Sequence, residues 1–182
     1  VDNTIDYLQT ATRMPDILHS HYADGGYVGS RISHVLGIPL IHTGHSLGRV
    51  KRRRLLASGL NADEVESRYN MARRVDAEET TLASAERVIT STSQEIEEQY
   101  GLYDFYQPKQ MVVIPPGTDL TRFHPPVGKE WQTEIAAEIG RFLKESEKPI
   151  ILALSRPDTR KNISSLVVAY GQDKALQEAA NL

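Results

Sequence analysis

The sequence predicts an α/β fold built on parallel sheets. Short, almost wholly apolar segments alternate with helix-like stretches from one end of the chain to the other. Strands that alternate with helices form parallel sheets through right-handed crossovers, and near-continuous apolar strands are typical of a sheet that is covered on both faces. The composition, with 40% hydrophobic and 25% charged residues, is that of a folded globular protein and excludes a disordered one.

The charge balance and the absence of cysteine exclude several classes of function. The 182 residues contain 21 Lys and Arg against 24 Asp and Glu, whereas dedicated nucleic-acid-binding domains are usually strongly basic. Without cysteine there are no disulfides and no thiol catalysis, which fits a reducing compartment. No apolar run approaches the roughly 20 residues that span a bilayer. The polar, acidic start is unlike a signal peptide, from which we expect a cytoplasmic location. We therefore expect neither a membrane nor a nucleic-acid partner.

The predicted elements follow one another in a regular order. Short apolar segments predict five strands, at 16–20, 39–43, 87–92, 111–114 and 150–155. Helical spacing of apolar residues predicts helices at 25–36, about 61–85, about 93–100, about 131–146 and about 162–171, with a short one near the end.

Three of these helices carry more specific expectations. The helix at 25–36 is expected to bury one face, formed by Val28, Ile32 and Val35. The helix at about 61–85 is expected to bury a second stripe, formed by Ala72, Val75, Leu82 and Ala85. A capping box is predicted where the third helix begins, from Ser91 with Gln94 or from Thr92 with Glu95.

A proline-rich segment at 115–126 divides the chain. It holds four of the nine prolines, and proline suits neither a helix nor a central strand because it lacks a backbone N–H and has a fixed φ. We interpret it as an interdomain linker between residues 1–114 and residues 127–182. Four predicted strands precede it and one follows, and one strand cannot form a sheet. Each domain is therefore expected to be incomplete in this chain, which begins with Val rather than Met.

Unusual residues follow the predicted strands, where open α/β sheets bind their ligands. The loop after the first strand contains Asp24 and Gly25, and the loop after the second contains Gly44 and His45. Glycine at such a turn lets the backbone approach a ligand closely. His45 is either a polar contact or proton-transfer group for a sugar hydroxyl, or a loop histidine with local hydrogen bonds.

A metal site is not predicted from the other histidines. His19 and His21 alternate along one predicted strand, His42 lies on another, and no carboxylates are spaced to complete a coordination shell. The chain also lacks the GxxxxGK[ST], GxGxxG and GxSxG motifs of phosphate loops, dinucleotide-binding folds and serine nucleophiles.

A run of five cations occupies residues 49–54 (RVKRRR). Three interpretations are open: the run grips nucleic-acid phosphates, forms a solvated helix face, or contributes one or two cations to a small phosphate site. The acidic sequence that follows and the absence of interleaved aromatic residues weaken the first interpretation.

Two further cation pairs are candidates for phosphate binding. Arg73 and Arg74 are either intrahelical partners of the following glutamates or a guanidinium site for phosphate. Arg156 and Lys161 lie in one loop near a predicted helix start, which suits an anion such as a diphosphate; otherwise they belong to an ordinary polar loop.

Six segments carry these features in a fixed order and spacing. They are HSHYADGGYVG (19–29), HTGHSLGRVK (42–51), RRVDAEE (73–79), VITSTSQEIEEQYGLYD (88–104), VIPPGTD (113–119) and LALSRPDTRKNI (152–163). Together they resemble the retaining GT-B glycosyltransferases of family 4, and among them the sucrose-phosphate synthase family. The pair TGHSLG and RRVDAEE separates this resemblance from more distant members, including sucrose synthase.

The resemblance implies two facing Rossmann-like domains and a reaction. Glucose would be transferred, with retention, from UDP-glucose or ADP-glucose to fructose 6-phosphate, giving sucrose 6-phosphate. Three sets of site residues are implied: His45 at the donor glucose, with Asp24, Gly25 and Gly44 in supporting loops; Lys51, Arg73 and Arg74 at the acceptor phosphate; Arg156 and Lys161 at the donor diphosphate. Neighbouring helical residues point about 100° apart, so one of the two adjacent arginines is expected to be structural.

The resemblance also sets limits. Residues 1–114 would be the later part of the N-terminal acceptor-binding domain, and residues 127–182 the start of the nucleotide-sugar-binding domain. The glycine-rich loop expected near the start of the N-terminal domain and the C-terminal half of the donor domain, with the family's E-x7-E element, are not found in these 182 residues, so the isolated chain is expected to be inactive.

Cofactor, partner and source follow from the same resemblance. No cofactor is required, and Mg²⁺ is compatible with the reaction but is not indicated, because a D-x-D motif is missing. A sucrose-phosphate phosphatase is an implied partner, and a bacterial source is expected. Two alternatives stay open: a mannosylfructose-phosphate synthase that uses GDP-mannose, and a non-catalytic nucleic-acid binder that uses residues 49–54.

Overall fold

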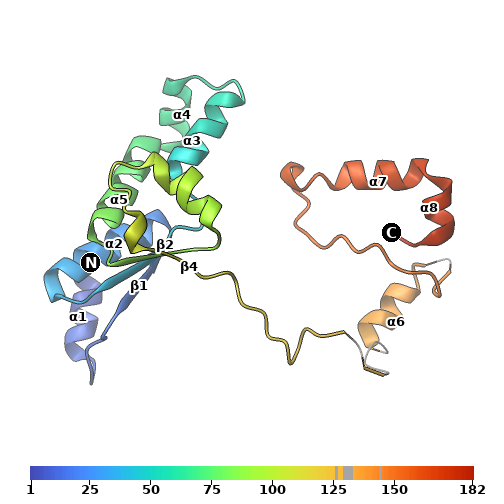
Figure 1. Cartoon of the computed structure of the whole chain (residues 1–182), viewed down its shortest axis with the longest axis horizontal. Helices are drawn as coiled ribbons and strands as arrows, with labels where there is room; N and C mark the ends of the chain where they lie inside the picture. Colours follow the sequence, from blue (N-terminus) through green and yellow to red (C-terminus); the bar gives the residue numbers. More distant parts are fainter. Residues whose placement is uncertain (126, 129–132, 144) are drawn as a thin grey trace. The chain divides into compact units, whose positions relative to one another are not determined.

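The structure, a computed structural model, describes residues 1–125, 127–128, 133–143 and 145–182. The chain divides into two compact units, Val1–Thr118 and Asp119–Leu182, which are coloured blue to yellow and yellow to red in Figure 1. The division falls within the proline-rich segment. In the part of the chain that is described, no helix is long and apolar enough to cross a membrane.

The first unit is built on a parallel sheet. Its four strands run in the order β1-β2-β3-β4 and all pair in parallel. They are β1 (Leu18–His21), β2 (Leu40–Thr43), β3 (Arg87–Thr90) and β4 (Met111–Val113). The α/β fold class is therefore confirmed, and each strand predicted before the prolines is present within about two residues of its expected bounds.

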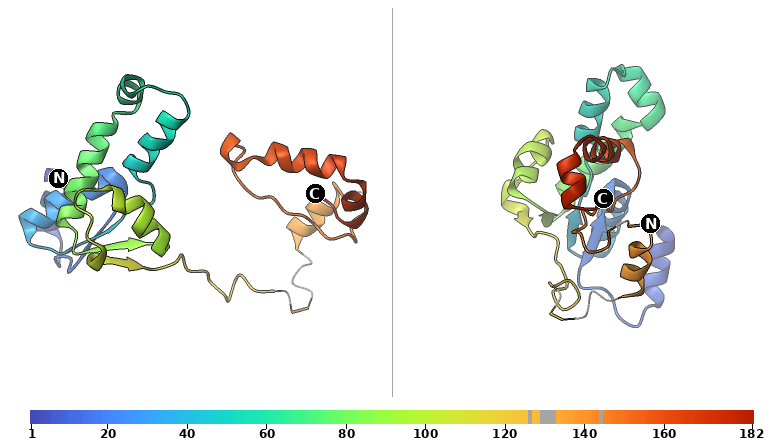
Figure 2. Two further views of the ribbon diagram at one scale, coloured as in Figure 1. Left: turned by 45° about the horizontal axis from the view of Figure 1, so that its top comes forward. Right: turned by 90° about the vertical axis from the view of Figure 1, so that its right-hand side faces the viewer.

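Helices connect and cover these strands. In the first unit they are α1 (Asp2–Thr10), α2 (Tyr22–Leu36), α3 (Gly48–Ala57), α4 (Ala62–Tyr69), α5 (Met71–Ser84), the π-helical turn η1 (Glu95–Gln99) and the 3₁₀ turns η2 (Tyr100–Leu102) and η3 (Pro108–Gln110). Helices α2 and α5 pack against each other. Helices α3 and α4 form a contacting pair that extends away from the sheet (Figure 2).

Helix α2 buries a face of mostly small residues, and the predicted apolar stripe is confirmed for Ile32 but wrong for Val28 and Val35. Its buried residues are Ala23, Gly26, Gly29, Ser30 and Ile32. Val28 and Val35 are exposed instead. The reason is close packing: a Cβ on Gly26 would lie 2.6 Å from Thr81 Oγ1 of α5, and one on Gly29 would lie 3.0 Å from Leu40 Cδ1 of β2. Only glycine allows the helix to approach both elements this closely.

The predicted long helix at 61–85 is two helices. Asn61 starts α4 with a capping box that it forms with Glu64. Asn70 then adopts a left-handed φ of 47°, which ends α4 and turns the chain into α5. Asparagine tolerates this conformation better than most residues do. The expected stripe is confirmed for Leu82 and Ala85, which are buried, and in part for Val75, which is half-buried against the same core. Ala72 is exposed.

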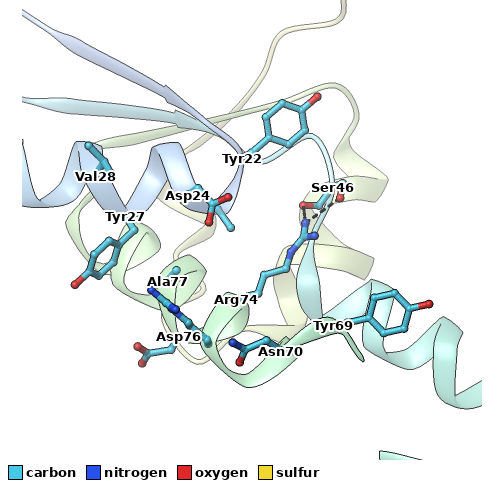
Figure 3. A pocket seen from close by; sticks show the side chains of 12 residues that line it. Tyr22, Asp24, Tyr27, Val28, Ser46, Tyr69, Asn70, Arg74, Asp76 and Ala77 are labelled. Carbon is cyan, nitrogen blue, oxygen red and sulfur yellow. Dashed lines mark hydrogen bonds between the residues drawn. The ribbon is translucent and has the colours of Figure 1, made fainter. Parts of the chain in front are cut away.

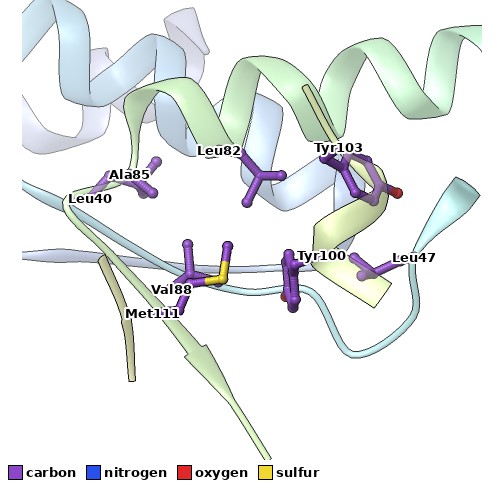
Figure 4. Close-up of a cluster of buried hydrophobic side chains, with 8 residues drawn as sticks. All are labelled: Leu40, Leu47, Leu82, Ala85, Val88, Tyr100, Tyr103 and Met111. Atoms are coloured by element: carbon purple, nitrogen blue, oxygen red, sulfur yellow. The ribbon is translucent and has the colours of Figure 1, made fainter. Parts of the chain in front are cut away.

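The core lies between α5 and the sheet (Figure 4). It consists of the buried side chains of Leu40, Leu47, Leu82, Ala85, Val88, Tyr100, Tyr103 and Met111. The two tyrosines come from the segment after β3, which begins at Thr92. There the Glu95 N–H donates to Thr92 Oγ1 (3.1 Å), as expected for a cap, but the Glu95 carboxylate accepts from the Ser91 N–H (2.8 Å) rather than from that of Thr92.

The second unit is helical, and its predicted strand is wrong. It contains α6 (Glu134–Gly140), η4 (Thr159–Lys161), α7 (Ile163–Gln172) and α8 (Lys174–Ala179). Of the predicted strand at 150–155, only Ile150 pairs, in an isolated bridge with Asn181. Leu152 and Leu154 are 74% and 90% exposed. A strand needs a neighbour for its backbone groups, and the described residues of this unit form no sheet. Of the helix expected at 131–146, residues 131, 132 and 144 lie outside the described part of the chain.

Two adjacent glycines of α2 give a test of the close packing. We expect Gly26→Ala to lower the free energy of unfolding by about 1–3 kcal/mol, because the new Cβ overpacks the contact with Thr81. Gly25→Ala is the matched control: its Cβ meets no atom within 4 Å, so the change should be neutral or stabilise by up to about 1 kcal/mol through helix propensity. Urea unfolding of both variants checks this, and equal effects would contradict the packing argument.

Candidate functional site

A cleft of about 940 Å³ lies in the first unit, next to the carboxyl ends of β1 and β2 (Figure 3). Its lining comes from the start of α2, the loop after β2, the end of α4 and the first half of α5. The lining residues are Tyr22, Ala23, Asp24, Tyr27, Val28, Ser46, Tyr69, Asn70, Arg73, Arg74, Asp76 and Ala77. Aromatic rings, two carboxylates and two guanidinium groups therefore share one cleft of the size that binds a small molecule.

The loop 44–48, which follows β2 and includes the first residue of α3, is held by three hydrogen-bonded anchors. The Gly44 N–H donates to the buried Tyr100 hydroxyl (3.2 Å), and the Gly48 N–H donates to both oxygens of Glu78 (3.0 and 2.9 Å). Between them, Arg74 Nη2 donates to the carbonyl and the Oγ of Ser46 (2.6 and 2.9 Å). A Cβ on Gly44 would lie 2.6 Å from the Tyr100 hydroxyl, so this position requires glycine.

His45 sits in this loop in a strained conformation. Its φ is 57°, and Tyr22 has a φ of 61°, both in the left-handed region that costs a residue with a side chain about 1 kcal/mol or more. His45 Nε2 lies 2.8 Å from His21 Nδ1, and its ring contacts the Tyr22 ring at 4.7 Å between centroids. The imidazole is thus fixed beside the cleft wall that Tyr22 forms.

A cluster of histidines lies behind His45. His42 is buried on β2 and is within hydrogen-bond distance of Ser20 Oγ (3.0 Å). Burial, with the neighbouring imidazoles of His21, His19 and His45, lowers the pKa of His42 to about 4. Among the described residues, no group of three or more His, Asp and Glu side chains is arranged to hold a metal ion.

The two adjacent arginines have different surroundings. Arg74 is committed to the protein: its Nε donates to Glu78 (3.1 Å) and its Nη2 to Ser46. Arg73 is exposed, lines the same cleft and, among the described residues, forms no ion pair. The intrahelical pairing that was one interpretation of these arginines is therefore present for Arg74.

Glu78 and two tyrosines build the site, and sequence reasoning did not single them out. Glu78 is 2% exposed and also accepts a hydrogen bond from the Tyr103 hydroxyl. Burial raises the pKa of Tyr103, with the Glu78 hydrogen bond and charge adding to the effect. The only available signal was a glutamate four residues after Arg74, which by itself reads as an ordinary helix pair.

The basic run of α3 is divided among different roles. Arg49 pairs with Glu79 (2.6 Å) and Asp104 (2.7 Å), both within the protein. Lys51 Nζ lies 4.9 Å from the ring centroid of Tyr69, a cleft residue, so this cation is next to the cleft without lining it. The remaining three arginines, residues 52–54, are exposed on the helix. The run is thus not one continuous phosphate-binding surface.

The other candidate residues are placed as follows. Asp24 lines the cleft, whereas Gly25 is exposed on α2 and nothing near it requires a glycine. Arg156 and Lys161 are exposed in the second unit, around η4. Between them, Asp158 caps η4 and pairs with Arg160 (3.3 Å), which lowers the pKa of that carboxyl.

Comparisons with known proteins agree on one family. The family model described as Glycosyltransferase Family 4 matches residues 6–122. "Probable sucrose-phosphate synthase 1" of Oryza sativa subsp. indica is 41% identical, over 93% of this chain and 19% of that protein. "Sucrose-phosphate synthase" of Zea mays is 40% identical, over 93% of this chain and 20% of that protein. The chain thus spans about one fifth of the length of these relatives.

A solved structure shares the fold. Sucrose-phosphate synthase from Thermosynechococcus elongatus superposes with a TM-score of 0.65 at 28% identity, over 95% of this chain and 38% of that chain. The resemblance inferred from the six segments is therefore confirmed. The matched proteins come from plants and from Thermosynechococcus elongatus.

The buried His42 predicts a pH dependence of stability. Its folded-state pKa of about 4 lies below the ordinary value of 6.5, so the unfolded chain binds a proton first as the pH falls. His42 thus costs no stability above its unfolded-state pKa and lowers stability between that value and its folded-state pKa, by about 2 kcal/mol between pH 7 and pH 5. Urea unfolding of the wild type and His42→Gln at both pH values measures this. A loss of the same size in the variant would contradict the assignment.

Proposed function

The chain belongs to glycosyltransferase family 4, and we propose that the full-length protein transfers glucose from a nucleotide-glucose to fructose 6-phosphate, giving sucrose 6-phosphate with retention of configuration. The observation that carries the proposal is the cleft in which the exposed Arg73 lies beside two carboxylates and Ser46. The similarity to sucrose-phosphate synthases at 40–41% identity supports this choice of reaction.

The cleft suits a phosphorylated sugar as acceptor. The guanidinium of Arg73 offers a planar fork that matches phosphate, and Lys51 stands close by, against Tyr69. Asp24, Ser46 and Asp76 line the same space and can hydrogen-bond with sugar hydroxyls. The aromatic walls formed by the three tyrosines then provide apolar contact for the sugar ring.

The donor side is assigned to His45 and to the second unit. We assign His45 to the donor glucose, since the loop holds its imidazole in a fixed, strained position. Arg156 and Lys161 are assigned to the donor diphosphate; among the described residues neither forms an ion pair. In the reaction, the bond between the glucose anomeric carbon and the diphosphate oxygen breaks, and a bond to the acceptor oxygen forms on the same face.

The proposed reaction accounts for the negative charge that develops on the diphosphate and for the proton of the acceptor hydroxyl. Negative charge grows on the departing diphosphate, so fixed cations stabilise the transition state more than the ground state. The acceptor hydroxyl loses its proton to an oxygen of the leaving diphosphate, and no separate carboxylate base is needed. The product is a sugar phosphate, which a phosphatase would consume. We place the reaction in the cytoplasm, in keeping with the absence of cysteine.

The donor is tested by incubating the full-length protein with fructose 6-phosphate and UDP-glucose, ADP-glucose or GDP-mannose. We expect release of nucleoside diphosphate with a glucose donor, dependent on fructose 6-phosphate, and sucrose 6-phosphate as the product. Release with GDP-mannose alone would identify a mannosylfructose-phosphate synthase instead. No release with any donor would contradict the proposed function.

The assignment of sides is tested by substitution in the same protein. Arg73→Ala or Lys51→Ala should raise the KM for fructose 6-phosphate about tenfold or more, the effect of losing one charge-assisted contact to phosphate. Arg156→Ala should mainly lower kcat, with little effect on that KM. Arg53→Ala, an exposed cation on the same helix as Lys51, is the control and should change neither constant. If each of these variants raised the KM for fructose 6-phosphate and the KM for the nucleotide-glucose equally, the assignment of residues to acceptor and donor would be contradicted.

A further inference from the structure

We propose that Glu78 is a positioning residue for the acceptor site: it holds the loop 44–48 and Arg74 in place, so that Arg73 is the guanidinium that binds phosphate. This inference rests on the proposed function for its kinetic consequences. Its structural basis is a continuous chain of contacts that runs from a buried carboxylate to the wall of the cleft.

The chain of contacts begins at the Glu78 carboxylate, which is 2% exposed. It accepts from the Gly48 N–H with both oxygens (3.0 and 2.9 Å), from Arg74 Nε (3.1 Å) and from the Tyr103 hydroxyl. These donors come from three separate segments of the chain. A buried carboxylate is tolerated only when such donors surround it, so the segments are held in register by the same group.

The loop is shaped to receive this carboxylate. Gly48 is the first residue of α3, where a negative charge is favourable because it faces the positive end of the helix dipole. A Cβ on Gly48 would lie 2.7 Å from Glu78 Oε2 and 3.2 Å from Arg74 Cγ. The absence of a side chain at Gly48 therefore gives the carboxylate direct access to the backbone.

The second link leads from Glu78 to the cleft through Arg74. Arg74 Nε donates to Glu78. Its Nη2 donates to the carbonyl and the Oγ of Ser46 (2.6 and 2.9 Å), and Figure 3 shows these two side chains directed toward each other. Ser46 lines the cleft and directly follows His45. Two of the three guanidinium nitrogens of Arg74 are thus used within the protein, and Glu78 balances its charge. The neighbouring Arg73 keeps its full charge for a ligand.

Glu79 offers a matched control for a purely structural effect. It is the next residue on α5, and its side chain is 13% exposed. Its carboxylate pairs with Arg49 (2.6 Å) and accepts from the N–H groups of Asp104 (3.0 Å) and Phe105 (3.1 Å). It therefore ties the same helix to the same region of the protein, but without contacting Ser46 or Arg74.

The experiment compares Glu78→Gln with Glu79→Gln in the full-length protein. Glutamine keeps the size of the side chain and can still accept from Gly48, but it no longer holds the Arg74 cation. For Glu78→Gln we expect the KM for fructose 6-phosphate to rise about tenfold or more. The KM for the nucleotide-glucose should rise less, because His45 in the same loop is also held by His21. Glu79→Gln should leave both constants within about twofold. Equal rises of the acceptor KM in the two variants would overturn the proposal.

A double-mutant cycle tests whether Glu78 acts through Arg74. In an Arg74→Met background, Glu78→Gln should have little further effect on the acceptor KM, because the intermediate link is already gone. Fully additive effects would contradict the mechanism. If Glu78→Gln does not fold, Glu78→Asp, which keeps the charge on a shorter side chain, should show a smaller rise of the same constant.

A measurement without catalysis separates this inference from the proposed function. Amide hydrogen exchange of residues 44–48 should become at least about tenfold faster in Glu78→Gln than in Glu79→Gln. Only the first variant removes the charged partner of Arg74, and with it the anchor that Arg74 provides at Ser46. Unchanged exchange would overturn the positioning role even in an active enzyme. Faster exchange in a protein that transfers no sugar would retain the role of Glu78 in holding the loop, and would refute the proposed function instead.

Discussion

A buried carboxylate needs hydrogen-bond donors around it, and in this chain that requirement brings together α3, α5 and the segment after β3. Glu78 draws together the N–H of Gly48, the guanidinium of Arg74 and the hydroxyl of Tyr103. The free energy of leaving any of these groups unpaired in the interior is on the order of 1–3 kcal/mol. The start of α3, the middle of α5 and the segment after β3 are therefore held to one another by polar contacts as well as by apolar packing.

Close packing of α2 determines where the remaining space lies. Because Gly26 and Gly29 allow this helix to sit directly against α5 and the sheet, the bulk of its side chains is displaced to its start and its outer face. Tyr22, Asp24 and Tyr27 from that start become cleft residues. The two glycines hide the buried face of α2 from an apolar-stripe analysis, and they also allow the position of α2 in which its first residues line the cleft.

The sequence predicts those parts of the structure that are determined by a local residue pattern, and it does not predict those that are determined by tertiary contacts. The four strands of the first unit were predictable because short apolar runs between helices have few other folds available. The orientation of α2 was not, since an apolar-stripe argument gives Val28 and Val35 more weight than glycine, and glycine is buried here for its lack of volume. The break at Asn70 depends on one φ angle, and the segment 150–155 lacks the neighbouring strand that its composition anticipates.

The same distinction holds for the site. The loops that carry Asp24, Gly44 and His45 could be found from their position after strands, whereas the separate environments of Arg73 and Arg74 depend on contacts with residues nearly 30 positions away, such as Ser46. Glu78 was hidden because an i,i+4 pair is common on helices. What makes it unusual is its burial, which no local pattern reports.

The charge balance around the cleft favours a small, oriented ligand over an extended polyanion. Glu78 neutralises Arg74, Arg49 is paired with Glu79 and Asp104, and the cleft itself holds Asp24 and Asp76 beside Arg73. A polyanion is attracted by a broad positive field, whereas the three exposed arginines of α3 do not line the cleft. A sugar phosphate instead needs one correctly placed guanidinium group for its phosphate and hydrogen-bond acceptors for the hydroxyls of the sugar. Because Arg74 and Arg49 are paired within the protein, recognition of that phosphate depends on Arg73.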